Sequence, residues 1–97
     1  MSKKELLNID KYCLITFPTT HSALHAEKVL EESQAPPFII VPTPREISAG
    51  CGLAIRIFCE DVSSITGRLA NNGIEAMGFY EVAKSQGKNT VIHLTYK

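Results

Sequence analysis

The stretch Tyr12-Cys13-Leu14-Ile15-Thr16-Phe17-Pro18-Thr19-Thr20-His21 joins a strand to a helix and decides how the chain is organised. Residues 12–17 are apolar, β-branched or aromatic in their majority, which predicts a short strand buried on both faces. Pro18 ends this strand, and the hydroxyl groups of Thr19 and Thr20 can cap a helix. Apolar residues then recur at helical spacing, so we expect a helix from about His21 to Ser33.

The rest of the chain continues to alternate between strands and helices. The sequence predicts one further helix, at residues 62–71, and strands at residues 38–41, 53–59, about 75–82 and 90–96. The order β-α-β-β-α-β is that of the ferredoxin-like, or split βαβ, arrangement. We therefore predict an α+β fold with an antiparallel sheet, two helices on one face and an appended C-terminal strand.

Length and composition indicate one domain. We expect residues 1–97 to form it, with a loosely ordered segment at 1–10, a core at 12–82 and an extra strand at 90–96. Hydrophobic residues make up 44% of the chain and charged residues 21%, which is typical of a folded protein.

Several classes of partner and location are disfavoured by the same sequence. The formal net charge is zero, so the basic surface of a nucleic-acid-binding protein is missing. No window approaches 18 apolar residues, and the N-terminus lacks the apolar region of a signal peptide. We expect a cytoplasmic protein that binds neither a membrane nor a nucleic acid and needs no cofactor.

The three cysteines do not form a CxxC pair, which argues against a disulfide framework or a zinc finger. Free thiols in a reducing cytosol are therefore expected. Cys13 lies within a predicted strand and is interpreted as a core residue. Cys59 precedes Glu60 and Asp61, whose negative charges disfavour a thiolate, so a packing role is expected for it.

Cys51 differs from the other two cysteines because glycines flank it in a loop of defined shape. The segment 42–52, Pro-Thr-Pro-Arg-Glu-Ile-Ser-Ala-Gly-Cys-Gly, lies between two predicted strands. Proline restricts φ and glycine permits φ > 0, so this composition predicts a shaped loop. Few neighbouring side chains can cover the sulfur of Cys51, which favours a reactive thiol.

The ferredoxin-like topology brings this loop and the start of the first helix to the same end of the domain. A free thiol has a pKa of about 8.5, so a nucleophilic cysteine needs groups that stabilise its anion. We predict that Cys51 is a carrier thiol, with Arg45 and His21 as its catalytic partners. The residues predicted to bind the anion are Thr19, Thr20, Ser48, Gly50 and Gly52.

Other roles stay open for these residues. Arg45 can pair with Glu46, and His21 can be an ordinary residue of the first helical turn. His21 and His25 are four residues apart, and with Cys51 they could form a metal site. This spacing occurs often by chance, so no metal site is predicted. The motifs of the common hydrolases, nucleotide-binding proteins and metalloproteases are missing, which favours a carrier or binding protein over a stand-alone enzyme.

Several motifs together resemble a family of small bacterial proteins described as selenium/sulfur carrier-like. The motifs are Phe17-Pro18-Thr19-Thr20-His21, residues 26–30 (Ala-Glu-Lys-Val-Leu), residues 42–48 (Pro-Thr-Pro-Arg-Glu-Ile-Ser) and residues 51–54 (Cys-Gly-Leu-Ala). The resemblance covers roughly residues 12–80. It implies a cytosolic single-domain protein in which Cys51 is the carrier thiol, with donor and acceptor proteins as partners.

Three functions are compatible with these sequence features, and each depends on a different part of the protein. The first is a sulfur or selenium carrier that depends on Cys51. The second is a small-molecule or anion sensor, in which the glycines matter and Cys51 does not. The third is a structural subunit that pairs through the edge of its sheet, and a homodimer would be one such assembly.

Overall fold

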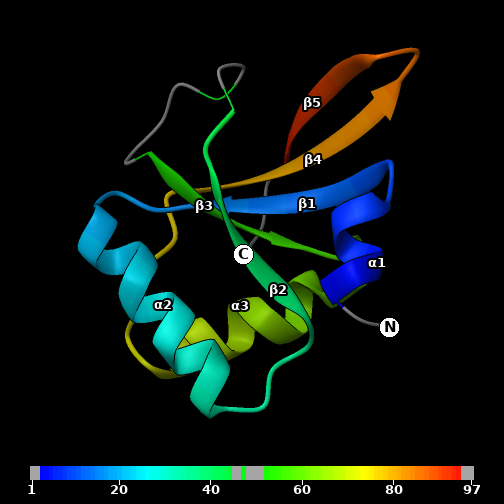
Figure 1. The fold of residues 1–97 in the computed structure, drawn as a ribbon. Coiled ribbons are helices and arrows are strands. Elements are labelled where there is room, and N and C mark those ends of the chain that lie inside the picture. Colours follow the sequence, from blue (N-terminus) through cyan, green and yellow to red (C-terminus); the bar gives the residue numbers. More distant parts are fainter. Residues whose placement is uncertain (1–2, 45–46, 48–51, 95–97) are drawn as a thin grey trace.

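The computed structural model describes residues 3–44, 47 and 52–94 of the chain. Figure 1 shows an antiparallel sheet with helices packed against it. The helical segments are α1 (Lys3–Asn8), α2 (Thr20–Glu32), the 3₁₀ turn η1 (Cys59–Asp61) and α3 (Val62–Asn71). The strands are β1 (Lys11–Thr16), β2 (Phe38–Pro42), β3 (Leu53–Ile57), β4 (Gly78–Ser85) and β5 (Lys88–Leu94).

β1 lies in the middle of the five-stranded sheet, whose strand order is β2-β3-β1-β4-β5. It pairs with β3 on one side and with β4 on the other, and every pairing in the sheet is antiparallel. Cys13 lies opposite Ile57, and Thr16 lies opposite Ala54. The end of β1 therefore meets the start of β3. The α+β class and the antiparallel sheet predicted from the sequence are confirmed.

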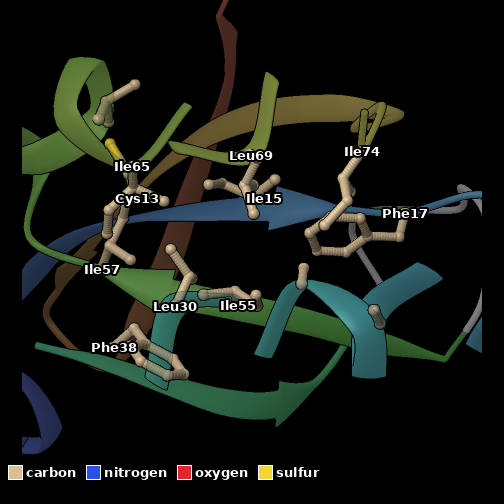
Figure 2. Packing of buried hydrophobic residues seen from close by; sticks show 13 residues of the cluster. Cys13, Ile15, Phe17, Leu30, Phe38, Ile55, Ile57, Ile65, Leu69 and Ile74 are labelled. Atoms are coloured by element: carbon tan, nitrogen blue, oxygen red, sulfur yellow. The ribbon is translucent and has the colours of Figure 1, made fainter. Parts of the chain in front are cut away.

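The main core lies between the sheet and helices α2 and α3 (Figure 2). Each helix contributes apolar residues at spacings of three and four, which places them on one side of the helix. Those of α2 are Ala23, Ala26 and Leu30, and those of α3 are Val62, Ile65 and Leu69. They pack against residues of β1 and β3 that include Cys13, Ile15, Ile55 and Ile57. The ends of the two helices are also linked, because Arg68 Nη1 donates a hydrogen bond to the Ser33 carbonyl at 2.7 Å.

A second, smaller cluster covers the opposite side of β1 and β3. Leu14, Ala54 and Val82 are buried there together with Ile47, a residue of the segment between β2 and β3. Alternate residues of a strand point to opposite faces of its sheet, so Leu14 belongs to this cluster while Cys13 and Ile15 belong to the main core. The sheet is thus buried on both faces near its centre, as the apolar composition of residues 12–17 predicted.

The first turn of α2 is capped by a threonine, as predicted. Thr19 has extended backbone angles, and its Oγ1 accepts a hydrogen bond from the Ser22 amide at 3.0 Å. The Ala23 amide donates to the Thr19 carbonyl at 3.2 Å and so continues the helical ladder. Thr19 is therefore the N-cap, and Thr20 is the first residue of the helix. Among the described residues, no helix is long and apolar enough to cross a membrane.

The N-terminal segment contains a helix that the sequence did not predict. The structure has a helix, α1, at Lys3–Asn8, and the side chain of Leu6 is fully buried. Lys3 Nζ lies 5.3 Å from the centroid of the Phe38 ring, which connects α1 to β2. A six-residue helix is too short to be stable in isolation, so these contacts hold it in place.

The last two strands form a tighter hairpin than the sequence indicated. β4 and β5 pair from Phe79 opposite Leu94 to Ser85 opposite Lys88. Only Gln86 and Gly87 lie between the strands, and their φ angles are 51° and 79°. Two consecutive residues with positive φ are typical of a two-residue hairpin turn, which matches the twist of the strands. The two strands therefore extend into residues 83–89, which the sequence had left between them.

We predict that α1 contributes to stability through one leucine. Leu6→Ala removes a fully buried side chain and should lower the free energy of unfolding by about 2 kcal/mol or more. Leu7→Ala is the matched control, because Leu7 is 58% exposed and its loss should change stability by less than about 0.5 kcal/mol. Urea denaturation measures both. Equal stabilities of the two variants would show that α1 does not pack in solution.

The cap of α2 gives a second prediction. Thr19→Ala should lower the free energy of unfolding by about 1 kcal/mol, because the Ser22 amide loses its acceptor. Thr20→Ala should change it by less than about 0.5 kcal/mol, since the described residues offer its hydroxyl group no hydrogen bond. Thr19→Ser keeps the acceptor and should behave as the unmodified protein. A larger loss from Thr20→Ala than from Thr19→Ala would contradict this assignment of the cap.

Candidate functional site

The segment between β2 and β3 is held at its base by backbone pairing. Pro42 lies opposite Leu53 at the end of the β2–β3 ladder. One step further, the Thr43 amide donates a hydrogen bond to the Gly52 carbonyl at 2.9 Å. The two ends of the segment therefore stay side by side, which is the geometry of a closed loop.

Ile47 attaches the middle of this segment to the sheet. Its side chain is buried in the cluster that contains Leu14 and Ala54, and its amide donates to the Pro44 carbonyl at 3.0 Å. A loop that buries an apolar side chain of its own has less conformational freedom than one held only by its ends. The shape of the complete loop stays a prediction.

Four of the predicted site residues lie outside the described residues: Arg45, Ser48, Gly50 and Cys51. Gly52 is described and exposed, and a Cβ atom added to it would meet nothing within 4 Å. The space beside Gly52 is therefore open. The roles assigned to these residues stay predictions.

The start of α2 lies at the same end of the sheet as the loop. Thr16, the last residue of β1, lies opposite Ala54. Ala54 is the second residue of β3, the strand that follows the loop. Phe17 is fully buried and fixes the chain between β1 and α2. The amides of Thr20 and His21 have no hydrogen-bond acceptor among the described residues. Two N–H groups of the first helical turn are thus open to an external acceptor.

His21 and His25 lie on the side of α2 that faces the connection between α3 and β4. Both are exposed and line a hollow of about 310 Å³ together with Pro18, Ser22, Gly73, Ile74 and Glu75. Their ring centroids are 6.4 Å apart. No described residue of the 42–52 segment lines this hollow. Within the described part of the chain, no three His, Cys, Asp or Glu residues are arranged to hold a metal ion.

The expectation of three free thiols is wrong for two of them. The structure joins Cys13 of β1 to Cys59 of η1 in a disulfide, with their Cα atoms 5.0 Å apart. Cys13 is 2% exposed and belongs to the main core, as predicted, while Cys59 is half-buried. The pairing was missed because the two residues are 46 positions apart. The register of β1 and β3 was the available signal, since it brings Cys13 opposite Ile57, two residues before Cys59.

Arg56 is a second feature that the sequence did not reveal. Its guanidinium carbon lies 3.7 Å from the centroid of the Tyr12 ring, and its Nη2 donates to the Ile9 carbonyl at 3.4 Å. Arg56 Nε is buried, and no described residue offers it a hydrogen-bond partner. Tyr12 and Arg56 lie on the face of the sheet opposite α2 and α3, at the end away from the loop. This arginine therefore belongs to the packing between β1 and the N-terminal segment.

Comparisons with known proteins agree with the resemblance seen in the sequence. Neither curated proteins nor solved structures gave a match to the chain. A family model does match, over residues 12–81, which run from the second residue of β1 through α2, β2, the loop, β3 and α3 to the middle of β4. The expected family is therefore confirmed, and the chain belongs to the family described as putative Se/S carrier protein-like.

Proposed function

We propose that Cys51 carries a sulfur or selenium atom, which it takes from a donor protein and passes to an acceptor protein. The observation that carries this proposal is the disulfide between Cys13 and Cys59. The sequence has three cysteines, so Cys51 is the one left outside this bond. The family match also spans the position of Cys51. A carrier needs one accessible thiol, and the flanking glycines leave little side-chain bulk around it.

The transfer requires only thiol exchange. The Cys51 thiolate attacks the outer sulfur of a donor persulfide, and the S–S bond to the donor breaks as the donor leaves as a thiolate. The outer sulfur, with its proton, is now bound to Cys51. An acceptor thiolate then attacks the outer sulfur of the Cys51 persulfide, and Cys51 leaves as a thiolate. Each step forms and breaks one bond to the same sulfur, so no external oxidant or reductant is consumed. Selenium bound to a donor thiol would follow the same steps.

The start of α2 supports anion binding close to the loop. The open amides of Thr20 and His21 lie at the N-terminus of a 13-residue helix, where partial positive charge stabilises anions. We assign the Arg45 guanidinium to the same task, with Ser48 and the amides of Gly50 and Gly52 as further donors. The His21 side chain has less support than the His21 amide, because its described neighbours belong to the α3–β4 connection.

We infer a ferredoxin-like class for the fold and a cytoplasmic location for the protein. The strand order, in which β1 and β3 are central and β5 extends the β4 edge, supports the first inference. The second rests on chemistry, because a carrier thiol must be reduced before it accepts its cargo, and cytosolic thiols are kept reduced apart from those of redox-active pairs.

The carrier role predicts that Cys51→Ser abolishes the transfer. Protein treated with glutathione persulfide and freed of excess reagent should gain the mass of one sulfur atom and then pass labelled sulfur to an added acceptor thiol. Cys51→Ser should neither gain nor pass the sulfur. The matched control is the double variant Cys13→Ala/Cys59→Ser, which retains Cys51 and should transfer sulfur at the rate of the unmodified protein.

Intact-mass measurement with peptide mapping reads the outcome, and circular dichroism verifies that each variant is folded. A Cys51→Ser protein that passes sulfur to the acceptor at the original rate would exclude Cys51 as the carrier. Loss of transfer in the double variant alone would assign the carrier role to the Cys13–Cys59 pair instead.

A further inference from the structure

The Cys13–Cys59 pair joins the centre of the sheet to the segment that begins α3. Cys13 lies in β1, the central strand, and Cys59 is the first residue of η1, which leads directly into α3. The proposed transfer of sulfur or selenium by Cys51 does not use either residue. The pair therefore needs a separate account.

The two cysteines of the pair differ in how far each residue is exposed to solvent. Cys13 is 2% exposed and packs in the main core together with Ile15, Ile57 and Ile65 (Figure 2). Cys59 is half-buried, and the residue that follows it, Glu60, is exposed. A reagent that arrives from solvent therefore reaches Cys59 before Cys13. This is the asymmetry of an exchange-active pair, in which one sulfur meets the partner and the other completes the reaction inside the protein.

We propose that Cys13 and Cys59 form a redox pair that reduces a persulfide, or its selenium analogue, and releases sulfide or selenide. This inference deepens the proposed carrier function, because it adds a reductive outlet for the same cargo. Release of sulfide from a persulfide requires two electrons, which a pair of thiols supplies when it becomes a disulfide. The structure shows this oxidised form, with both cysteines joined.

The reaction balances in two steps. The Cys59 thiolate attacks the outer sulfur of R–S–SH, the R–S bond to that sulfur breaks, and R–S⁻ leaves to be protonated. The Cys13 thiolate then attacks Cys59 Sγ and expels HS⁻, which forms the disulfide. In total, R–S–SH and two thiols give R–SH, H₂S and one disulfide. The second step needs no long movement, because the Cα atoms of the pair are only 5.0 Å apart. A cellular dithiol then reduces the pair again.

The persulfide comes from outside the chain that reduces it. Leu53 and Ile57 lie at opposite ends of β3, separated by roughly 13 Å at about 3.3 Å per residue. Cys51 precedes Leu53 by two residues, and Cys59 follows Ile57 by two. The base of the loop and the Cys13–Cys59 pair therefore lie at opposite ends of β3. The substrate class is therefore a small persulfide or a persulfide on a second protein molecule.

The test uses the full-length Cys51→Ser variant, so that acceptance by Cys51 plays no part. This protein is reduced with dithiothreitol, freed of reductant without air, and mixed with one equivalent of glutathione persulfide. The expected result is one equivalent of sulfide per chain, accompanied by a Cys13–Cys59 cross-linked peptide in the non-reducing peptide map. Release of no more sulfide than in buffer alone would overturn the proposal.

Two further variants separate the roles of the sulfurs. In the Cys51→Ser background, Cys13→Ala should accumulate a persulfide on Cys59 and release no sulfide, whereas Cys59→Ser should gain no sulfur because Cys13 is buried. If Cys13→Ala fails to fold, the mapped disulfide and the Cys59→Ser result still decide the matter. A pair that dithiothreitol reduces only in denaturant would be a structural cross-link, and this result would also overturn the proposal.

The outcomes are distinct from those that test Cys51. Sulfur transfer by the Cys13→Ala/Cys59→Ser variant without sulfide release by the Cys51→Ser variant would leave the carrier standing and remove the redox pair. The reverse result would establish the pair and remove the carrier.

Discussion

The antiparallel pairing of β1 with both β3 and β4 is the constraint on which the rest of the structure depends. Its register places Thr16 opposite Ala54 and Cys13 opposite Ile57. The first of these pairings brings the start of α2 to the loop that carries Cys51 in the sequence. The second brings Cys13 within reach of Cys59. A shift of one residue would turn the buried side chains of β1 to the opposite faces of the sheet, so burial on both faces fixes this register.

The same register separates the base of the loop from the Cys13–Cys59 pair by the length of β3. The closed base of the loop, with its hydrogen bond from Thr43 to Gly52, lies at the start of the strand. The Cys13–Cys59 pair lies beyond its other end. A carrier thiol and a reducing pair separated in this way would not quench each other within one molecule. The cargo could then be passed on intact, or be reduced when a second molecule presents it.

The sequence predicted most elements because their patterns are local. The apolar run at residues 12–17, the Thr19 cap and the helix at residues 62–71 each depend on neighbours a few positions away. The Cys13–Cys59 pair and the Arg56–Tyr12 contact were not predicted, because both depend on strand register across the sheet and not on neighbouring residues. The α1 helix was missed for a related reason, since its order comes from the burial of Leu6 against distant residues.

For the candidate site, too, the sequence predicted some features and not others. Spacing and topology were sufficient to predict that the start of α2 and the ends of the loop lie at the same end of the sheet. They were not sufficient to show that His21 and His25 turn toward Gly73 and Glu75, because the rotation of a helix about its axis is set by its packing. This is why the proposed anion site draws on the α2 amides and not on the imidazole of His21.

The central claim is that Cys51 is the thiol that holds the cargo. The most direct measurement is a peptide map of the unmodified protein, with its Cys13–Cys59 disulfide intact, after treatment with a sulfane sulfur donor. The account predicts that the added sulfur atom is found on the peptide that contains Cys51, and on no other peptide. Added sulfur on the Cys13 or Cys59 peptides, with the Cys51 peptide unchanged, would contradict it.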